Sequence, residues 1–317
     1  LPQLHLQGID PFFALFSEAD PANSKMQIAW IYQTGIGMGE RDYYLEKKNA
    51  SLRDAYLNLM TTEFALAGYD KLVSLPASEL AKMVMNIETR LAKAQYDNLT
   101  NRDPFKTYHM TKLADAEKLA AAIDFKNYFA TMGLPKLESF NMCQPEYITE
   151  VSKVLATENV ESVKAYYAWN IINTADAYLS DDFVDANFAF YGKEMSGREQ
   201  NRPRWKRVTS TIDGALSEAL GQLYVEKYFP KEAKDRMVTL VDNLKEAFAQ
   251  RIEGAAWMSD MTKAKALEKL SAILVKVGYP DKWRDYINIV FIGTNGDSSG
   301  LRFSMYSMAS SSAFSAH

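Results

Sequence analysis

The chain has 317 residues, of which 47% are hydrophobic and 24% charged, and its formal net charge at pH 7 is −4. This composition is ordinary for a soluble globular protein, and the length suffices for one large domain or two smaller ones. The acidic balance gives no electrostatic support for nucleic-acid binding, and no apolar run is long enough to predict a membrane span. The chain begins Leu1-Pro-Gln without a basic stretch followed by an apolar one, so no targeting segment is predicted.

Helices dominate the predicted elements. The one predicted strand is Gln27 to Gln33, which is short and is followed by Gly35. Apolar residues at helical spacing predict the helices 51–67, 158–179, 208–228 and 231–252, and two more that begin at Ser78 and Thr111. Helix ends are expected at Gly68, Gly133-Leu-Pro135 and Pro230. The predicted class is therefore all-α, with at most a short strand near residues 27–33.

A further helix with clear end signals follows Trp257. Ser259 and Asp260 are both suitable N-caps, because their side-chain oxygens can accept from unpaired N–H groups of the first turn. Gly278 supplies a left-handed residue after the helix, and Pro280 prevents its continuation. The apolar stripe of this helix consists of Leu267, Leu270, Leu274 and Val277. The pattern predicts a helix that packs on a core, and no catalytic role is assigned to it.

The composition changes at Phe291. Three glycines, at positions 293, 296 and 300, precede a serine-rich tail that ends at His317. Neither helical nor strand periodicity is present, which is typical of a linker or a disordered end. The predicted organisation is a helical lobe over 1–290 and a tail over 291–317.

Two patches suggest phosphate or nucleic-acid chemistry. Gly35-Ile-Gly37-Met-Gly39 follows the predicted strand, but it lacks the Gly-x-Gly-x-x-Gly spacing and has no following Lys-Ser/Thr, so positive-φ turns are favoured over nucleotide binding. Arg202-Pro-Arg204-Trp-Lys206-Arg207 places a ring among four cations, as nucleic-acid binders do. One such cluster on an acidic chain favours a helix entrance with paired arginines and a buried Trp205.

The remaining titratable residues form no catalytic constellation in the sequence. Glu63, Glu88 and the Asp181-Asp182 pair lie on predicted helices or helix ends, and are interpreted as solvated or capping groups. Cys143 has no histidine close to it in the sequence and is not expected to be a nucleophile. Because it is the only cysteine, an intrachain disulfide framework is excluded, although this does not fix the compartment.

The three histidines do not form a metal motif. None of His5, His109 and His317 begins a His-Glu-x-x-His sequence. His109 has no second ligand at metal spacing, and His317 is terminal and isolated. No catalytic, cofactor-binding or metal-binding residue is therefore predicted within 1–317.

Five blocks, in order, resemble the M13 (neprilysin-like) zinc metallopeptidases. Gly35-Ile-Gly-Met-Gly-Glu-Arg-Asp-Tyr-Tyr-Leu45 is similar to the family's Gly-Leu-Gly-Leu-Pro-x-Arg-Asp-Tyr-Tyr-Leu segment. The run from Phe188-x-Phe-Tyr-Gly192 through Met195-Ser-Gly197 to Pro203-Arg-Trp-Lys-Arg207 is similar to a second block. The others are Gly221-x-Leu-Tyr-Val-Glu-Lys-Tyr-Phe229, Trp257-Met-Ser-x-x-Thr262 and Gly278-Tyr-Pro-Asp-Lys-Trp283. The resemblance covers about residues 8–286.

The resemblance implies a fold and a location. Members have two largely helical lobes around a cavity: one carries the zinc site, and the other is a lid that restricts access to smaller peptides. The matched blocks belong to the lid and to the segments that lead toward the zinc lobe. Gly39 stands where the family usually has proline, and Val208 where secreted animal members often have cysteine, which fits a bacterial member. The resemblance also implies a periplasmic or extracellular location.

The zinc chemistry of the family has no counterpart in this sequence. A zinc peptidase needs two histidines at i and i+4, a third ligand and a water-activating glutamate. This chain alone is therefore expected not to hydrolyse peptides. It is interpreted as the lid portion of an M13 endopeptidase, either a fragment or a partner of a second chain that bears the zinc. One alternative is an inactive helical module that binds peptides or other proteins. Another is that the zinc segment is missing after Ile289-Val-Phe291, because the family has a similar tripeptide close before its zinc helix.

Overall fold

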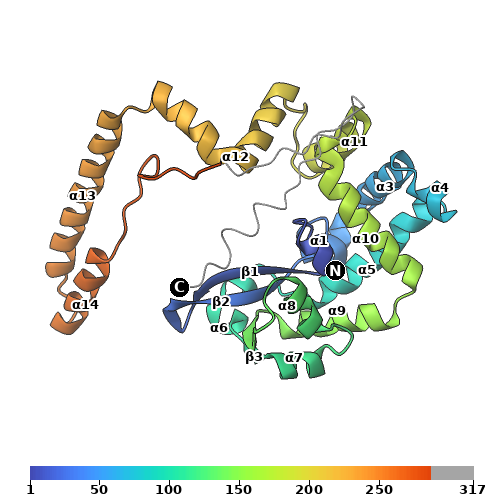
Figure 1. The fold of residues 1–317 in the computed structure, drawn as a ribbon, viewed down its shortest axis with the longest axis horizontal. Coiled ribbons are helices and arrows are strands. Elements are labelled where there is room, and N and C mark those ends of the chain that lie inside the picture. Colours follow the sequence, from blue (N-terminus) through green and yellow to red (C-terminus); the bar gives the residue numbers. More distant parts are fainter. Residues whose placement is uncertain (287–317) are drawn as a thin grey trace. The chain divides into compact units, whose positions relative to one another are not determined.

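The computed structural model describes residues 1–286. Within them the chain forms two compact units, 1–201 and 202–286, and the predicted lobe 1–290 therefore contains both. The predicted tail 291–317 lies outside the described residues. Figure 1 colours the chain along its sequence, with the second unit from yellow to red.

The first unit is mostly helical, as predicted. Its α-helices are α1 (Pro2–His5), α2 (Arg41–Leu45), α3 (Ala50–Leu66), α4 (Tyr69–Val73), α5 (Ala77–Ala94), α6 (Pro104–Thr107), α7 (Leu113–Leu119), α8 (Phe125–Thr131), α9 (Pro145–Thr157), α10 (Val160–Ala175) and α11 (Asp181–Asn187). Three short 3₁₀ helices are η1 (Lys47–Asn49), η2 (Thr100–Arg102) and η3 (Asp176–Tyr178), and a π-helix, η4 (Phe188–Glu194), follows α11 directly.

A four-stranded sheet is larger than the single predicted strand. Its strands are β1 (Phe13–Asp20), β2 (Asn23–Gln33), β3 (Met110–Lys112) and β4 (Ser139–Met142), in the order β1-β2-β4-β3. The predicted strand is the second half of β2, while the other three strands were not predicted. β2 pairs antiparallel with β1 and parallel with β4, and β3 pairs antiparallel with β4.

Aromatic side chains fill the core of the first unit. The helices α3, α5 and α10 contact one another, and Tyr56, Phe64 and Trp169 between them are almost fully buried. The Trp169 indole N–H donates to the Tyr56 hydroxyl at 2.8 Å, so the one polar atom of the indole is satisfied inside the core. Burial of such large rings is the main stabilising contribution to this unit.

Phe12 joins the start of β1 to two later helices. Its φ angle is +70°, a left-handed conformation that is unusual for a residue with a Cβ atom. The backbone N–H of Phe12 donates to the Tyr166 hydroxyl at 3.1 Å, and its carbonyl oxygen accepts from the Tyr147 hydroxyl at 2.5 Å. Both tyrosines are buried, so these contacts fix the unusual conformation from α9 and α10.

Most predicted helices of the first unit are present with small shifts. α3 closely matches the predicted 51–67, and Gly68 follows it with φ +66°. The Ser78 cap is wrong, because α5 begins one residue earlier, after Pro76, without a side-chain cap. The helix start at Thr111 is also wrong: this residue lies in β3, whose pairing with β4 decides its conformation, and α7 begins at Leu113.

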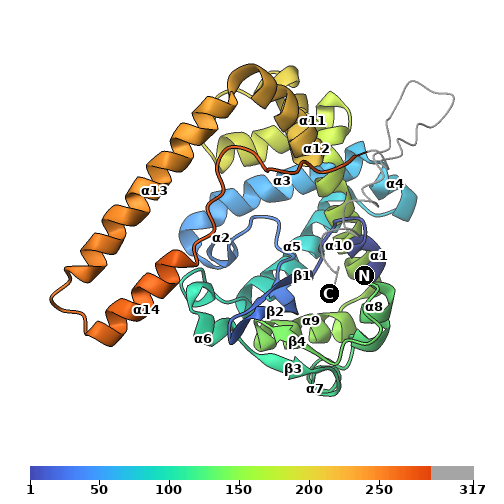
Figure 2. The same ribbon diagram turned by 60° about the vertical axis from the view of Figure 1, so that its left-hand side comes forward.

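The second unit consists of α12 (Arg204–Tyr228), α13 (Lys231–Glu253) and α14 (Asp260–Ser271). All three helices were predicted, and α13 and α14 lie side by side in Figures 1 and 2. α12 is interrupted at Leu216, whose φ and ψ angles of −130° and 40° are not helical. Ser259 caps α14 and accepts from the Thr262 N–H at 3.3 Å, as predicted.

The end of α14 differs from the prediction. The helix stops at Ser271, so Leu274 and Val277 lie beyond it and Gly278 is not its terminating residue. Gly278 does have the predicted positive φ, +69°, but for another reason: a Cβ atom there would lie 2.5 Å from the ring of Phe229. The Gly-Tyr-Pro-x-x-Trp block is therefore a packing element for the end of α12.

The rest of this block packs in the same way. The rings of Tyr279 and Trp283 stack with their centroids 5.7 Å apart, and Phe229 meets Tyr279 edge-on. Lys234 of α13 donates to the Tyr279 carbonyl oxygen at 2.9 Å and pairs with Asp281 at 2.8 Å. The block thus ties the junction between α12 and α13 to the segment after α14.

No helix among residues 1–286 is long and apolar enough to cross a membrane.

Candidate functional site

The Gly35–Gly39 loop is a packed turn. Gly35 and Gly39 have φ angles of +78° and +83°, which explains the glycines at these two positions. A Cβ atom on Gly37 would lie 1.9 Å from the Tyr56 hydroxyl, and one on Gly35 would lie 2.4 Å from the Tyr166 hydroxyl. Because buried side chains occupy this space, the loop has no room to hold a phosphate.

Glu88 lies under this loop and organises a buried hydrogen-bond network. It is 1% exposed, and its carboxylate accepts from the Tyr44 hydroxyl at 2.6 Å and from the Tyr56 hydroxyl at 3.2 Å. Burial raises the pKa of Glu88 to about 7, although the hydrogen bonds from Tyr44, the Gly37 backbone and Tyr56 oppose that shift. Its interpretation as a solvated or capping group is therefore wrong.

The network joins two of the sequence blocks. Tyr44 belongs to the first block and also accepts from the Met38 N–H at 3.0 Å, so it fixes the loop that precedes it. Tyr191 belongs to the second block and donates to the Gly37 carbonyl oxygen at 3.1 Å. Two segments about 150 residues apart thus meet over Glu88, and the roles of Tyr44 and Tyr191 here are structural.

Glu63 is also buried, which again contradicts the interpretation as a solvated or capping group. Its side chain is fully buried in α3, whereas Asp181 and Asp182 are exposed in the first turn of α11, as expected for a helix end. Carboxylates in the first turn of a helix interact favourably with its dipole. The sequence did not distinguish these two environments, because the burial of Glu63 depends on helices that arrive much later in the chain.

Of the two described histidines, His5 has a side-chain partner, whereas the ring Nδ1 of His109 is buried without a hydrogen-bond partner. His5 is buried, and its Nδ1 lies 2.7 Å from the Tyr128 hydroxyl; burial lowers the pKa of His5 to about 4. His109 donates its backbone N–H to the Asn141 side chain at 2.6 Å. His317 lies outside the described residues. Within 1–286, no three His, Cys, Asp or Glu side chains are placed to bind a metal ion together.

Cys143 and the arginine-rich cluster are not organised for catalysis either. Cys143 is buried, and burial raises the pKa of its thiol to about 12, so it is a poor nucleophile at neutral pH. At the start of α12, Trp205 is 66% exposed with the Lys206 ammonium 5.4 Å from its ring, so the prediction that Trp205 is buried is wrong. Arg202 donates to the Ser210 hydroxyl at 2.6 Å, close to its own position in the chain.

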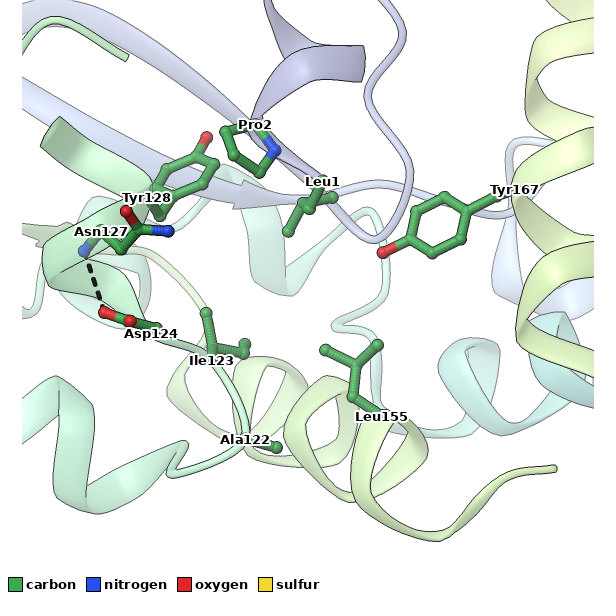
Figure 3. Close-up of a pocket in the computed structure, with 9 residues that line it drawn as sticks. All are labelled: Leu1, Pro2, Ala122, Ile123, Asp124, Asn127, Tyr128, Leu155 and Tyr167. Atoms are coloured by element: carbon green, nitrogen blue, oxygen red, sulfur yellow. Dashed lines mark hydrogen bonds between the residues drawn. The ribbon is translucent and has the colours of Figure 1, made fainter. Parts of the chain in front are cut away.

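A shallow hollow of about 240 Å³ lies between α1, α8 and the end of α9. Figure 3 shows that its walls are largely apolar, with Ile123, Leu155 and the ring of Tyr167 around it. Asp124 is the one carboxylate in the wall, and it caps α8 by accepting from the Asn127 N–H at 2.9 Å. The hollow therefore offers hydrophobic contact but no group for acid or base chemistry.

An uncovered apolar face distinguishes the second unit. α12 has no buried side chain over 25 residues, and α13 and α14 bury only Ile252 and Leu270. On α13 an apolar stripe at helical spacing is about half exposed, and it consists of Met237, Leu240, Leu244 and Phe248. Trp257 and Leu274 are 81% and 77% exposed. Soluble proteins rarely expose so many large apolar residues in succession unless another surface covers them.

Comparison with known proteins identifies the family. The model of the N-terminal domain of peptidase family M13 matches residues 1–280. The chain belongs to peptidase family M13. Human endothelin-converting enzyme 1 is 28% identical over 277 residues, which is 86% of this chain and 36% of that enzyme. Neprilysin-11 of Caenorhabditis elegans is 27% identical over 88% of this chain and 34% of its own length.

Solved structures agree with this assignment. The zinc metalloprotease Zmp1 of Mycobacterium tuberculosis, in complex with an inhibitor, is 31% identical with a TM-score of 0.79, and the match covers 90% of this chain and 43% of that one. PepO from Lactobacillus rhamnosis has a TM-score of 0.74 at 20% identity, which shows the shared fold. The M13 chain therefore spans less than half the length of these relatives.

The zinc of the family does not fit the described residues of this M13 chain. A zinc site needs nitrogen, sulfur or carboxylate donors that converge on one point. Here His5 is hydrogen-bonded to Tyr128, Cys143 is held as a buried thiol, and Glu88 is occupied by two hydroxyl donors. Sequence reasoning missed one feature, the exposure of the apolar residues of α12–α14. The periodicity gave these residues, but no sequence signal told whether they are covered.

Proposed function

We propose that this chain is the substrate-restricting lid portion of a zinc metalloendopeptidase that cleaves small peptides, and that the zinc lies on polypeptide outside residues 1–317. The first unit supplies a rigid wall, because its aromatic core and the Glu88 network leave few groups free to move. Its role is steric: it excludes large substrates from the catalytic cavity and contributes no reacting group.

The observation that carries this proposal is the uncovered apolar face of α12–α14. Exposed stripes such as Met237 to Phe248 fit a permanent interface better than a free surface. The partner we propose is the zinc-bearing lobe, whether it is continuous with this chain or a second polypeptide. The extent of the relatives supports this partner, since more than half of each one has no counterpart here.

The family relationship supports a periplasmic or extracellular site of action for a bacterial protein. The relatives include an endothelin-converting enzyme and a protein named as a zinc metalloprotease. Zinc in such an enzyme polarises the scissile carbonyl and activates a water molecule, and the residues that would hold it lie outside the described part of this chain.

The test is on the native protein, isolated with an antibody raised against residues 1–201. We expect an intact mass well above 35.8 kDa, or a second polypeptide that co-purifies in equal amount, together with about one zinc ion per complex. Chelation should abolish cleavage of a fluorogenic octapeptide, and a folded protein that contains the same octapeptide in a loop should resist cleavage.

The alternative function is a catalytically inactive helical module that binds peptides. Native material that has the mass of this chain, contains no zinc and binds the labelled octapeptide without cutting it would establish this alternative and exclude the lid proposal. Cleavage of the folded protein as fast as of the free octapeptide would exclude size restriction, even in a zinc-containing complex.

A further inference from the structure

Glu63 is a buried carboxyl group without a partner. It lies in α3 with 0% of its residue surface exposed, and neither of its side-chain oxygens has a hydrogen-bond partner. An ionised carboxylate in such surroundings is strongly disfavoured, because nothing replaces the water that it loses. Glu63 thus differs from Glu88, whose oxygens accept from two tyrosines.

A second buried acid faces Glu63 from another part of the chain. Asp176 is the first residue of η3, directly after α10, and is 4% exposed. Its carboxylate accepts from the side-chain amide of Asn187, at the end of α11. Burial and the charge of Asp176 together raise the pKa of Glu63 to about 8, and burial also raises the pKa of Asp176 to about 6.

The other groups around the pair add no positive charge. Tyr191 of η4 interacts electrostatically with both Glu63 and Asp176, and also with Glu88 of α5. Tyr191 donates its hydroxyl hydrogen to Gly37 and lies 3.3 Å from Asn173 of α10. Among residues 1–286, no ion pair involves Glu63 or Asp176. One proton on the pair is therefore the means by which the core avoids two adjacent buried charges.

We propose that Glu63 and Asp176 form a proton-dependent latch that holds the segment 176–195 against α3. With the proton bound, the segment stays packed; when the proton is lost, the two carboxylates repel each other and the segment opens to admit water.

The construction of the segment favours local opening. α11 has only seven residues and η4 is a π-helix, a rare and less favourable geometry. Its attachment depends on a few buried rings, such as Phe183 and Phe190, and on the hydrogen bond from the Tyr191 hydroxyl to the Gly37 carbonyl oxygen. The chain continues from this segment through 196–203 into α12, so the latch lies where the first unit ends. Short elements of this kind open with less free energy than the whole domain.

The direction of the pH effect follows from proton linkage. In the open segment Glu63 regains an ordinary carboxyl pKa near 4.5, whereas burial raises the pKa of the packed state to about 8. The packed state therefore binds the proton more tightly, and its advantage is complete below pH 4.5 and decreases as the pH rises toward 8. Opening should be rare at pH 5.5 and much more frequent at pH 8.5.

Hydrogen exchange of the purified chain, read by mass spectrometry on peptides from 176–195, tests the latch. After correction for the intrinsic pH dependence of exchange, we expect protection in this segment to fall at least tenfold between pH 5.5 and pH 8.5. Peptides from α9, which contains neither Glu63, Glu88 nor Asp176, serve as the internal reference in the same samples. The Glu63→Gln variant removes the group with the larger shift, so its protection should fall by a clearly smaller factor, to which only the buried Asp176 still contributes.

Two further variants complete the design. Glu63→Met has a similar length and removes both oxygens, so it should show the same smaller loss and covers the case that the glutamine variant does not fold. Glu161→Gln, an exposed acid at the start of α10, should behave like the unsubstituted chain. Equal protection of the unsubstituted chain at both pH values, or a loss in Glu63→Met as large as in the unsubstituted chain, would overturn the proposal. The readout does not involve peptide cleavage, so the latch and the proposed lid function stand or fall separately.

Discussion

The two units of this chain both contain helices with apolar residues at helical spacing, but they differ in what those helices cover. In the first unit, α3 and α5 bury rings and aliphatic side chains against other helices of the same unit. In the second unit, α12 to α14 carry apolar residues at the same spacing and leave most of them exposed. The difference teaches that an amphipathic pattern fixes a helix and its apolar stripe, while the partner of that stripe need not be on the same unit.

The largest expected contrast comes from the same substitution in each unit. Phe64 of α3 is fully buried, and Phe64→Ala should lower the free energy of unfolding by about 3–5 kcal/mol, since it removes a ring and leaves a cavity. Phe248 of α13 is 54% exposed, so Phe248→Ala should change it by about 0.5 kcal/mol or less. Urea unfolding followed by circular dichroism measures both. Similar losses in the two variants would show that the face of the second unit is covered in solution.

The second contrast is the pH dependence of the free energy of unfolding. It is measured in the Glu63→Met background, so that of the two buried glutamates only Glu88 remains to titrate. Burial raises the pKa of Glu88 to about 7, so its folded state binds the proton more tightly than the unfolded state. The stability that Glu88 contributes, taken as the difference from a Glu88→Gln control, should be largest below pH 4.5 and fall by on the order of 2–3 kcal/mol as the pH rises through 7. The difference removes the opposite effect of His5, whose pKa is lowered to about 4.

The control for this effect is Glu88→Gln. It should be less stable than its parent at pH 5, because a buried amide N–H₂ lacks acceptors, and it keeps the His5 contribution of its parent. Urea unfolding at pH 5, 6, 7 and 8 gives both curves. A stability difference between the parent and Glu88→Gln that stays constant or grows across this range would contradict the assigned environment of Glu88.

A pair of glycines gives a smaller contrast. Gly37→Ala places a Cβ atom 1.9 Å from the Tyr56 hydroxyl, and the forced shift should cost about 1–3 kcal/mol. Gly214, inside α12, has open space around its Cα atom, so Gly214→Ala should be neutral or stabilise by up to about 1 kcal/mol. Thermal unfolding separates the two signs. A stable Gly37→Ala variant would mean that the loop is not packed against Tyr56.

The smallest expected effect concerns the cap of α14. Ser259→Ala removes the acceptor for the Thr262 N–H and should cost about 1 kcal/mol locally. Ser259→Asp retains an acceptor and should be close to neutral. Hydrogen exchange in peptides from 260–271 is the appropriate measurement, because a local loss does not necessarily alter global unfolding. Equal exchange in both variants would show that the cap does not limit fraying.

The sequence predicted the elements whose signals are local. α3, α13 and the start of α14 were found because apolar spacing, caps and glycines lie within each element. β3 and β4 were not found, since they pair with distant residues, as Met110 with Asn141. β1 was missed although its partner β2 is the next element in the chain. Short strands of three or four residues carry too little alternation to be recognised alone.

The candidate site was predicted less completely, for a related reason. The family blocks could be recognised in the sequence, but only the structure brings Tyr44 and Tyr191 together. Tyr44 donates to Glu88, and Tyr191 donates to the carbonyl oxygen of Gly37 in the loop above it. The burial of Glu63 and the exposure of Trp205 both reversed the sequence interpretation. The identity of a residue does not show whether its side chain is buried, because other helices of the fold decide that.

The Phe12 contacts have a consequence for synthesis on the ribosome. The hairpin of β1 and β2 can pair early, but the backbone of Phe12 also binds Tyr147 and Tyr166, and these contacts are complete only after residue 166 has been translated. By contrast, α13 and α14 contact each other within a short stretch of chain. The first unit should therefore close late and cooperatively on the nascent chain, and truncation before Tyr166 should leave an aggregation-prone intermediate.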